Sequence, residues 1–328
     1  MNEQRRGRYG LTALLATICA VPLASAQSYP AKPVRMLVGF PPSGGNDVVA
    51  RVVATRLSER WGQSVIVENR PGATGTLAAN VVARSAGDGY TLLAGAVSTN
   101  AIAPFMYSNL PYDAEKAFAP VTLLASIPNL IAVHPSLPVK SLSELIALAK
   151  QMPGKLSFPS AGNGSTPHVA GEMFMLATSV RMLHVPYKGA GQAIPDLLAG
   201  QTSVSFDTTG TIITHVRSGR LRALAVAAPR RFPAIREVPT TAEAGLPGFE
   251  MSTWIGLFAP ADTPPAIVQR LHSEIAAVLR DPALRSKLTD TIGADESTTA
   301  SPEEFAAIFR KDLARYKKLV SAIGLKLD

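Results

Sequence analysis

Cysteine is nearly absent from this sequence, which contains one in 328 residues. That residue, Cys19, lies in an apolar run near the N-terminus that we expect to be removed from the working protein. The rest of the chain can then form neither a disulfide bond nor a thiolate metal site. Its stability must come from an apolar core, and a composition of 47% hydrophobic and 17% charged residues is sufficient for one.

The apolar run is too short to cross a membrane. It extends from Leu11 to Leu23, whereas a spanning helix needs about twenty apolar residues. Three arginines precede the run and the small residues Ala24-Ser25-Ala26 follow it, which is the pattern of a secretory signal peptide. We therefore expect residues 1–26 to be a cleaved signal peptide and the remaining chain to be exported.

The sequence patterns of metal sites and of serine hydrolases are missing as well. No H-E-x-x-H pair and no cluster of acidic residues accompanies any of the 5 histidines, and there is no G-x-S-x-G nucleophile elbow. Ser165 and His168 could suggest a hydrolase, but residues three apart at a helix start are poorly placed for the hydrogen bond that activates a nucleophile. We expect no metal, no cofactor and no catalytic residue.

A basic stripe is also absent. The densest basic pairs are Arg230-Arg231 and Lys317-Lys318, and no basic stripe interleaved with aromatic residues surrounds them. We therefore expect no binding of nucleic acid. The formal net charge of +8 favours encounters with anions.

Short aliphatic runs of strand length alternate with helix-length segments in the rest of the chain, which predicts an α/β fold. The predicted strands are Val34–Phe40, Val65–Asn69, Thr91–Ala96, Leu130–Val133, Arg181–Val185, Val204–Asp207 and Leu221–Ala227. The strongest predicted helices are Asn46–Trp61, Leu142–Gln151, Val169–Ala177, Pro265–Arg280 and Pro302–Ile323. The first two strands and the helix between them form a parallel crossover unit.

No flexible linker divides the chain. A chain of this length without a linker indicates two lobes joined by strands that cross between them more than once. We expect the crossings near Ala125–Asn129 and Glu250–Trp254. The first lobe is then discontinuous, with residues 27–126 and 253–328, and the second lobe contains residues 127–252.

The loop Gly39–Asp47 follows the first predicted strand and could bind an anion. Its glycines allow backbone amides to face a ligand at the start of a helix. Gly39 and Gly44 have the spacing of a phosphate-binding loop, but Gly45-Asn46 replaces the required lysine and Ser/Thr, so we expect no nucleotide binding. A simple helix cap within this loop is the alternative.

Small and hydroxyl residues also gather in other segments, most of them at the ends of predicted strands. They lie in Val97–Asn100, Ser157–His168, Val185–Gly191 and Phe206–Thr211. Ligands of α/β proteins bind at the carboxyl ends of strands, although helix capping is the alternative for these residues too. In the second segment we predict Thr166 as the N-cap and Pro167 as the first helical residue.

Taken in order, these segments resemble the substrate-binding receptors of tripartite tricarboxylate transporters, the Bug-type periplasmic solute-binding proteins. The resemblance covers essentially the whole chain after residue 26. It rests on Phe40–Asp47, Ser160–His168, Val185–Gly189, Val238–Phe249 and Trp254–Leu257, with Ala259-Pro260 and Thr263-Pro264. It implies a type II-like periplasmic binding protein with two lobes, each a mostly parallel sheet flanked by helices, and a ligand cleft between them.

The resemblance also implies what is bound and where. Receptors of this family grip a small carboxylate and hand it to the permease subunits of a membrane transporter. Carried over by position, the ligand-binding residues are Ser43, Gly44, Gly45, Asp47, Ser98, Thr99, Asn100, Ser160, Gly162, Ser165, Thr166, His168 and, on the second lobe, Asp207. Asp47 would order its loop, since a carboxylate that faced another carboxylate would be repelled. The expected protein is a periplasmic monomer without a cofactor.

Two alternatives keep other roles open. The same fold could present its ligand to a membrane sensor instead of a permease, or the chain could be an exported serine hydrolase that acts through Ser165. Pro159 and the turn Thr208–Thr211 differ from the residues that are usual at these positions in the family. Both lie on the lobe that we expect to set ligand specificity. The resemblance therefore does not identify the carboxylate.

Overall fold

The computed structural model describes residues 29–295 and 298–327, so the expected signal peptide lies outside the described residues. The strands are β1 (Val34–Val38), β2 (Val65–Asn69), β3 (Thr91–Ala96), β4 (Phe118–Val133), β5 (Ser157–Ser160), β6 (Leu183–Pro186), β7 (Val204–Thr208), β8 (Arg222–Val226) and β9 (Ser252–Pro260). The helices are α1 (Gly45–Trp61), α2 (Thr76–Ala83), α3 (Ala103–Met106), α4 (Leu142–Gln151), α5 (Thr166–Thr178), α6 (Ala190–Leu198), α7 (Thr209–Arg217), α8 (Pro265–Leu279), α9 (Pro282–Ile292) and α10 (Pro302–Ile323). Within the described residues, none of these helices combines the length and the apolar character needed to span a membrane.

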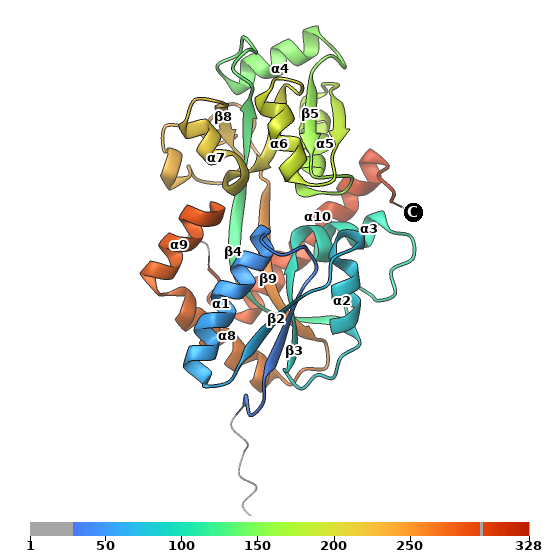
Figure 1. The fold of residues 1–328 in the computed structure, drawn as a ribbon. Coiled ribbons are helices and arrows are strands. Elements are labelled where there is room, and N and C mark those ends of the chain that lie inside the picture. The colour runs from blue at the N-terminus through green and yellow to red at the C-terminus, as the bar shows by residue number, and fades with distance from the viewer. Residues whose placement is uncertain (1–28, 296–297, 328) are drawn as a thin grey trace, which may run out of the picture.

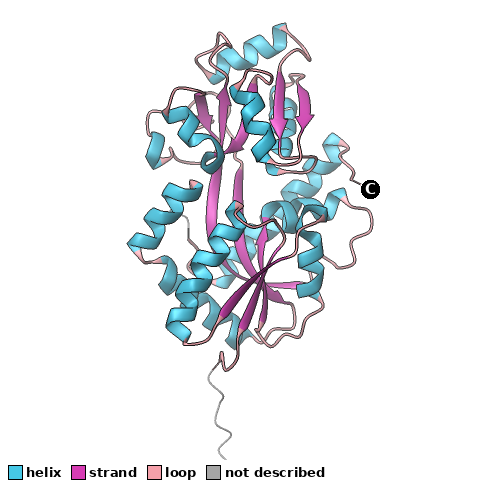
Figure 2. Ribbon diagram, viewed as in Figure 1, coloured by secondary structure: helices cyan, strands magenta, loops and turns pink. Residues whose placement is uncertain are grey.

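Two lobes stand one above the other in Figure 1, and the long strands β4 and β9 run between them. The lower lobe, called the first lobe from here on, contains β1–β3, α1–α3 and α8–α10. The upper or second lobe contains α4–α7 and β5–β8. Helices flank the strands of both lobes (Figure 2). The architecture is therefore the two-lobed α/β fold that the sequence predicts.

The parallel unit predicted near the N-terminus forms the edge of the first lobe. β1 pairs in parallel with both β2 and β3. Helix α1 buries Val49, Val53 and Leu57, because residues four apart lie on one side of a helix. Gly62 ends the helix in the left-handed conformation, with φ 62°, and its amide donates to the carbonyl of Ser58.

β4 and β9 join the lobes through hydrogen bonds as well as through the chain. From Phe118 to Pro128, β4 pairs antiparallel with β9, and from Asn129 to Val133 it pairs with β7 and β8. β9 also pairs antiparallel with β3. One 7-stranded sheet, in the order β2-β1-β3-β9-β4-β7 with β8 beside β4, therefore extends through both lobes. The parallel pairs in the described chain are β1 with β2 and β3, and β5 with β6.

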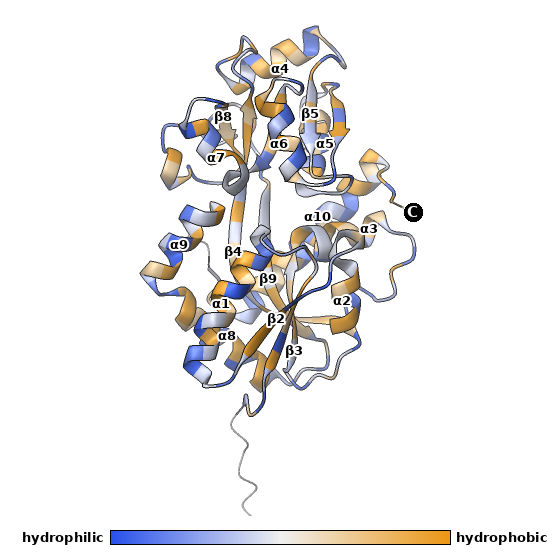
Figure 3. Ribbon diagram, in the orientation of Figure 1, coloured by the Kyte–Doolittle hydropathy of each residue, from blue (hydrophilic) through white to orange (hydrophobic). Residues whose placement is uncertain are grey.

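Three hydrophobic clusters fill the described structure, and the one that contains Phe158, Phe174 and Phe258 extends through both lobes. Val121 of β4 belongs to the cluster under α1 and α8, whereas Leu130 of the same strand belongs to the cluster under α7 and β8. Figure 3 shows hydrophobic residues concentrated along the strands of the first lobe. Two of the clusters therefore belong to one lobe each, and the third joins the lobes.

Two helix starts differ by one residue from the predictions. Helix α5 begins at Thr166, and its N-cap is Ser165. Helix α1 begins at Gly45, and its N-cap is Gly44. An N-cap residue needs an extended backbone, and Ser165 (φ −66°, ψ 157°) and Gly44 (φ −75°, ψ 164°) have one. The prediction of Thr166 as an N-cap was therefore wrong.

Candidate ligand-binding cleft

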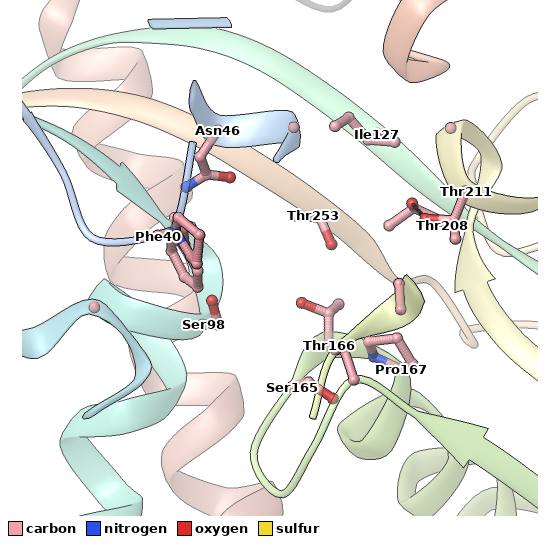
Figure 4. Close-up of a pocket in the computed structure, with 18 of the residues that line it drawn as sticks. Phe40, Asn46, Ser98, Ile127, Ser165, Thr166, Pro167, Thr208, Thr211 and Thr253 are labelled. Atoms are coloured by element: carbon pink, nitrogen blue, oxygen red, sulfur yellow. Dashed lines mark hydrogen bonds between the residues drawn. The ribbon is translucent and has the colours of Figure 1, made fainter. Parts of the chain in front are cut away.

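A cavity of about 750 Å³ lies between the two lobes. The loops after β1 and β2, with Ser98 after β3, line it from the first lobe. The loops that begin α5, α6 and α7 line it from the second lobe. Ile127 of β4 and Thr253 of β9 complete the wall where these strands cross between the lobes (Figure 4). The predicted loops from both lobes thus meet at one cavity.

Helices α1, α5, α6 and α7 start at this cavity. Their N-cap residues are Gly44, Ser165, Gly189 and Thr208. In the described chain no side chain caps these starts or those of α2, α3 and α8, whereas α4, α9 and α10 each begin with a side-chain cap. The first amides of a helix have no partner within the helix. The uncapped starts therefore present hydrogen-bond donors and the positive end of the helix dipole to the cavity.

Asp47 organises the loop that follows β1. This side chain is 3% exposed, and it accepts hydrogen bonds from the Ser43 amide (2.9 Å), Arg51 Nε (3.0 Å) and Asn69 Nδ2 (2.8 Å). Burial raises the pKa of the Asp47 carboxyl, but the hydrogen bonds from Arg51, Asn69 and Ser43 outweigh burial and hold the pKa below its usual value. Asp47 thus fixes the shape of the loop and is not among the residues that line the cavity.

The loop after β2 also lines the cavity, although no sequence pattern predicted it. Its lining residues are Pro71, Gly72, Thr74 and Gly75. This loop packs closely on the loop after β1, since a Cβ at Gly39 would lie 2.6 Å from the Cα of Gly75. Thr99 Oγ1 donates to the Thr74 carbonyl at 2.7 Å and so supports the loop from behind. The Pro71-Gly72 pair is the signal that could have indicated a turn here.

The predicted binding residues divide into two groups. Those that line the cavity are Ser43, Gly45, Ser98, Ser165, Thr166 and Asp207. Those that lie outside the lining are Gly44, Asp47, Thr99, Asn100, Ser160, Gly162 and His168. Further lining residues are Asn46, Lys188 and Thr211, which lie in the predicted segments but not among the predicted binding residues, and Thr253, which lies outside those segments. The structure therefore brings the predicted segments together at the cavity. Only some residues of each segment line the cavity, and the others lie behind the lining.

Ser165 and His168 are each engaged with other groups. Ser165 Oγ donates to the Gly162 carbonyl at 2.7 Å. His168 Nδ1 accepts the Gly164 amide at 3.0 Å, and its Nε2 lies 3.5 Å from Glu172. These contacts hold the segment between β5 and α5 in shape. They do not form the nucleophile-to-base pair of a hydrolase.

His184 of β6 supports the same segment from behind. Its Nε2 lies 2.7 Å from Ser160 Oγ, which in turn donates to the Gly162 carbonyl at 3.1 Å. Burial and, to a smaller extent, the nearby His168 together lower the pKa of His184 to about 4, although Glu172 acts in the opposite direction. At neutral pH the His184 ring is therefore uncharged. No sequence motif singled out this residue.

Asp207 lies one residue before the end of β7, lines the cavity and is 8% exposed. Its Oδ1 accepts the Thr208 amide at 2.7 Å. Burial raises the pKa of Asp207 to about 6, although hydrogen bonds from Thr208 and Thr211 act in the opposite direction. Asp207 can therefore change its charge near pH 6, within contact range of anything bound in the cavity.

Comparison with known proteins agrees with this geometry. A family model described as the tripartite tricarboxylate transporter family receptor matches residues 49–325. Protein BugT of Bordetella pertussis is 36% identical over 317 residues, which cover 95% of this chain and 96% of that protein. The structure of R. palustris Rpa4515 with adipate has a TM-score of 0.80 and 36% identity, covering 90% of this chain and 98% of that chain. MatC (Rpa3494) from Rhodopseudomonas palustris, with bound malate, has a TM-score of 0.77 and 32% identity, covering 89% and 100%.

Proposed function

This chain belongs to the tripartite tricarboxylate transporter receptor family, and from that premise we propose that it binds a small mono- or dicarboxylate between its lobes and delivers it to the permease subunits of a transporter. Members of this family are periplasmic substrate-binding receptors and not enzymes. In this proposal residues 1–26 are a cleaved signal peptide, and the protein works as a monomer in the periplasm.

The uncapped helix starts at the cavity carry the proposal. Each one offers backbone N–H groups without a partner in the helix, and the helix dipole favours a negative charge there. Among the described residues that line the cavity, the charged side chains are Lys188 and Asp207. Peptide dipoles and hydroxyl groups, with few full charges, would therefore hold the ligand. The relatives with bound adipate and malate support a carboxylate.

The two groups of predicted residues receive different roles. The residues that would contact the ligand are those of the lining: Ser43, Gly45, Ser98, Ser165 and Thr166. Asp207 would contact the far end of the ligand from the second lobe. The residues behind them would hold the loops in shape; these are Gly44, Asp47, Thr99, Asn100, Ser160, Gly162 and His168. The change of partner along β4 at Asn129 supports a division into residues 27–126 plus 253–328 and residues 127–252.

A panel of carboxylates tests the proposal. The purified protein would be screened by thermal shift and by calorimetry with adipate, malate, aliphatic monocarboxylates and benzoate, each beside its uncharged amide. At least one carboxylate should raise the melting temperature by mass action, and its amide should not. If no carboxylate gives either a shift or heat, the carboxylate assignment is wrong.

A further inference from the structure

One of the places where the lobes touch, besides β4 and β9, is where the start of α7 meets the end of α9 (Figure 1). The Thr209 hydroxyl donates to the Gly293 carbonyl at 2.8 Å, and Thr209 is 0% exposed. A Cβ at Gly210 would lie 2.0 Å from the Ile292 carbonyl oxygen, and a Cβ at Gly293 would lie 2.4 Å from the Gly210 nitrogen. The backbones of the two elements are therefore in direct contact.

These two elements belong to different cores. Leu284 and Leu288 of α9 are buried in the cluster that contains Leu57 of α1. Ile212 of α7 is buried with Leu197 of α6 in the second lobe. The α7–α9 contact therefore joins two clusters that belong to different lobes. A motion of the lobes about β4 and β9 can open this contact without disturbing either of these two clusters.

The contact lies at the rim of the cavity. Gly210 and Thr211 line the cavity from α7, and Thr291 and Ile292 line it from the end of α9. Thr211 also lies 2.8 Å from Thr208, oxygen to oxygen, and Figure 4 shows both threonines beside the cavity. A ligand between the lobes is thus enclosed on this side only while α7 and α9 remain together.

We propose that Thr209, Gly210 and Gly293 form a latch that closes when the lobes close on a ligand and that slows release of the ligand. This inference rests on the proposed function, because it requires a ligand held between the lobes. Thr209 is a positioning residue, since its side chain bonds to Gly293 and is not among the cavity lining. The two glycines permit the close approach of the backbones, which a Cβ at either position would block.

The first test removes the hydrogen bond and keeps the shape. In Thr209→Val, the dissociation rate of a carboxylate that binds the wild type should rise about fivefold, as expected for the loss of one buried hydrogen bond, with little change in the association rate. Thr178→Val is the matched control, because the buried Thr178 hydroxyl also donates to a carbonyl, that of Phe174, but far from the lobe contact. Stopped-flow measurements give both rates.

The second test blocks closure. Gly210→Ala should weaken carboxylate binding about tenfold or more while the ligand-free protein keeps its melting temperature, because an open molecule accommodates the extra methyl group. Ala147→Ser, at an exposed position of α4 outside the cavity lining, should change neither quantity. If Gly210→Ala instead destabilises the ligand-free protein, the contact is permanent and the latch is wrong.

The outcomes separate the two proposals. If no carboxylate binds the wild type, both the proposed function and the latch are refuted. If a carboxylate binds and Thr209→Val releases it at the wild-type rate, the latch alone is refuted.

Discussion

The imidazole rings of His168 and His184 lie stacked, with their centroids 3.8 Å apart and their planes inclined by 9°. Phe158 stacks against His184 as well, with a centroid distance of 5.1 Å. The stack lies behind the segment that carries Ser165 and Thr166 to the cavity. The nearness of His168 adds to burial in disfavouring the charged form of His184, so this support depends on pH.

We predict that acid weakens the fold through His184. Its pKa is about 4 in the folded protein and about 6.5 in an unfolded chain, so the unfolded chain binds the proton more tightly. The contribution to stability is therefore complete above about pH 6.5 and is lost as the pH falls toward about 4. Urea unfolding at pH 7.5 and pH 4.5 should show a smaller loss in His184→Gln than in the wild type.

The wild type must be compared with His184→Gln, because Asp207 changes the stability of the fold with pH in the opposite direction. The pKa of Asp207 is raised to about 6 in the folded protein, so its contribution to stability is lost as the pH rises from about 4 through 6. Equal pH dependence in the wild type and in His184→Gln would contradict the role of His184.

Asp47→Asn should loosen the loop after β1. The change removes the negative charge that accepts hydrogen bonds from Ser43, Arg51 and Asn69. The free energy of unfolding should fall by about 1–3 kcal/mol, the usual cost of disrupting a buried hydrogen-bonded charge. Glu59→Gln is the control, because Glu59 pairs with Arg56 on an exposed surface. Chemical denaturation that shows equal stability for both variants would rule out the structural role of Asp47.

Gly39→Ala should push apart the two first-lobe loops at the cavity. A Cβ at this position would meet the backbone of Gly75 at 2.6 Å, and such overpacking costs about 1–3 kcal/mol. We expect both a lower melting temperature and weaker carboxylate binding. A variant with the wild-type melting temperature would show that the loops separate freely.

Asp207→Asn should change how ligand binding depends on pH. Asp207 has a pKa of about 6, so in the wild type its negative charge grows between about pH 5 and pH 7 and repels a carboxylate. Titration calorimetry should show affinity for a simple aliphatic carboxylate that falls across this range in the wild type, but much less in the variant. At pH 7.5 the variant should bind several-fold more tightly, since two like charges about 4 Å apart repel each other by about 1 kcal/mol even in bulk water. Weaker binding by the variant would show that Asp207 instead accepts a hydrogen bond from the ligand.

The sequence predicted the elements whose patterns are local. Helices Leu142–Gln151 and Pro302–Ile323 have the predicted bounds, because apolar periodicity and N-terminal caps are read within a few residues. The strand predicted at Leu130–Val133 is only the end of β4, which starts at Phe118. Pro120 and Pro128 interrupt its strand signal, and burial along most of the strand removes the alternation of a one-sided strand.

The binding site was predictable only in part, because only some of its features depend on local sequence patterns. Glycine and hydroxyl residues after strands indicate the loops, but the orientation of each side chain depends on packing between loops. Thr99 supports the Thr74 carbonyl from behind, although its neighbour Ser98 lines the cavity. The stacking of His168 on His184 and the contact of Thr209 with Gly293 join residues far apart in the chain. No local pattern indicates such contacts.

The position of β9 determines when the sheet can be completed during synthesis. β9 lies between β3 and β4, yet it is formed by residues 252–260. Until that part of the chain has been made, the edges of β3 and β4 that face each other lack their partner. Pairings between distant residues form slowly, and an unpaired strand edge is a template for association with other chains. Chains that end before residue 252 should therefore aggregate, even though every segment of the second lobe is present in them.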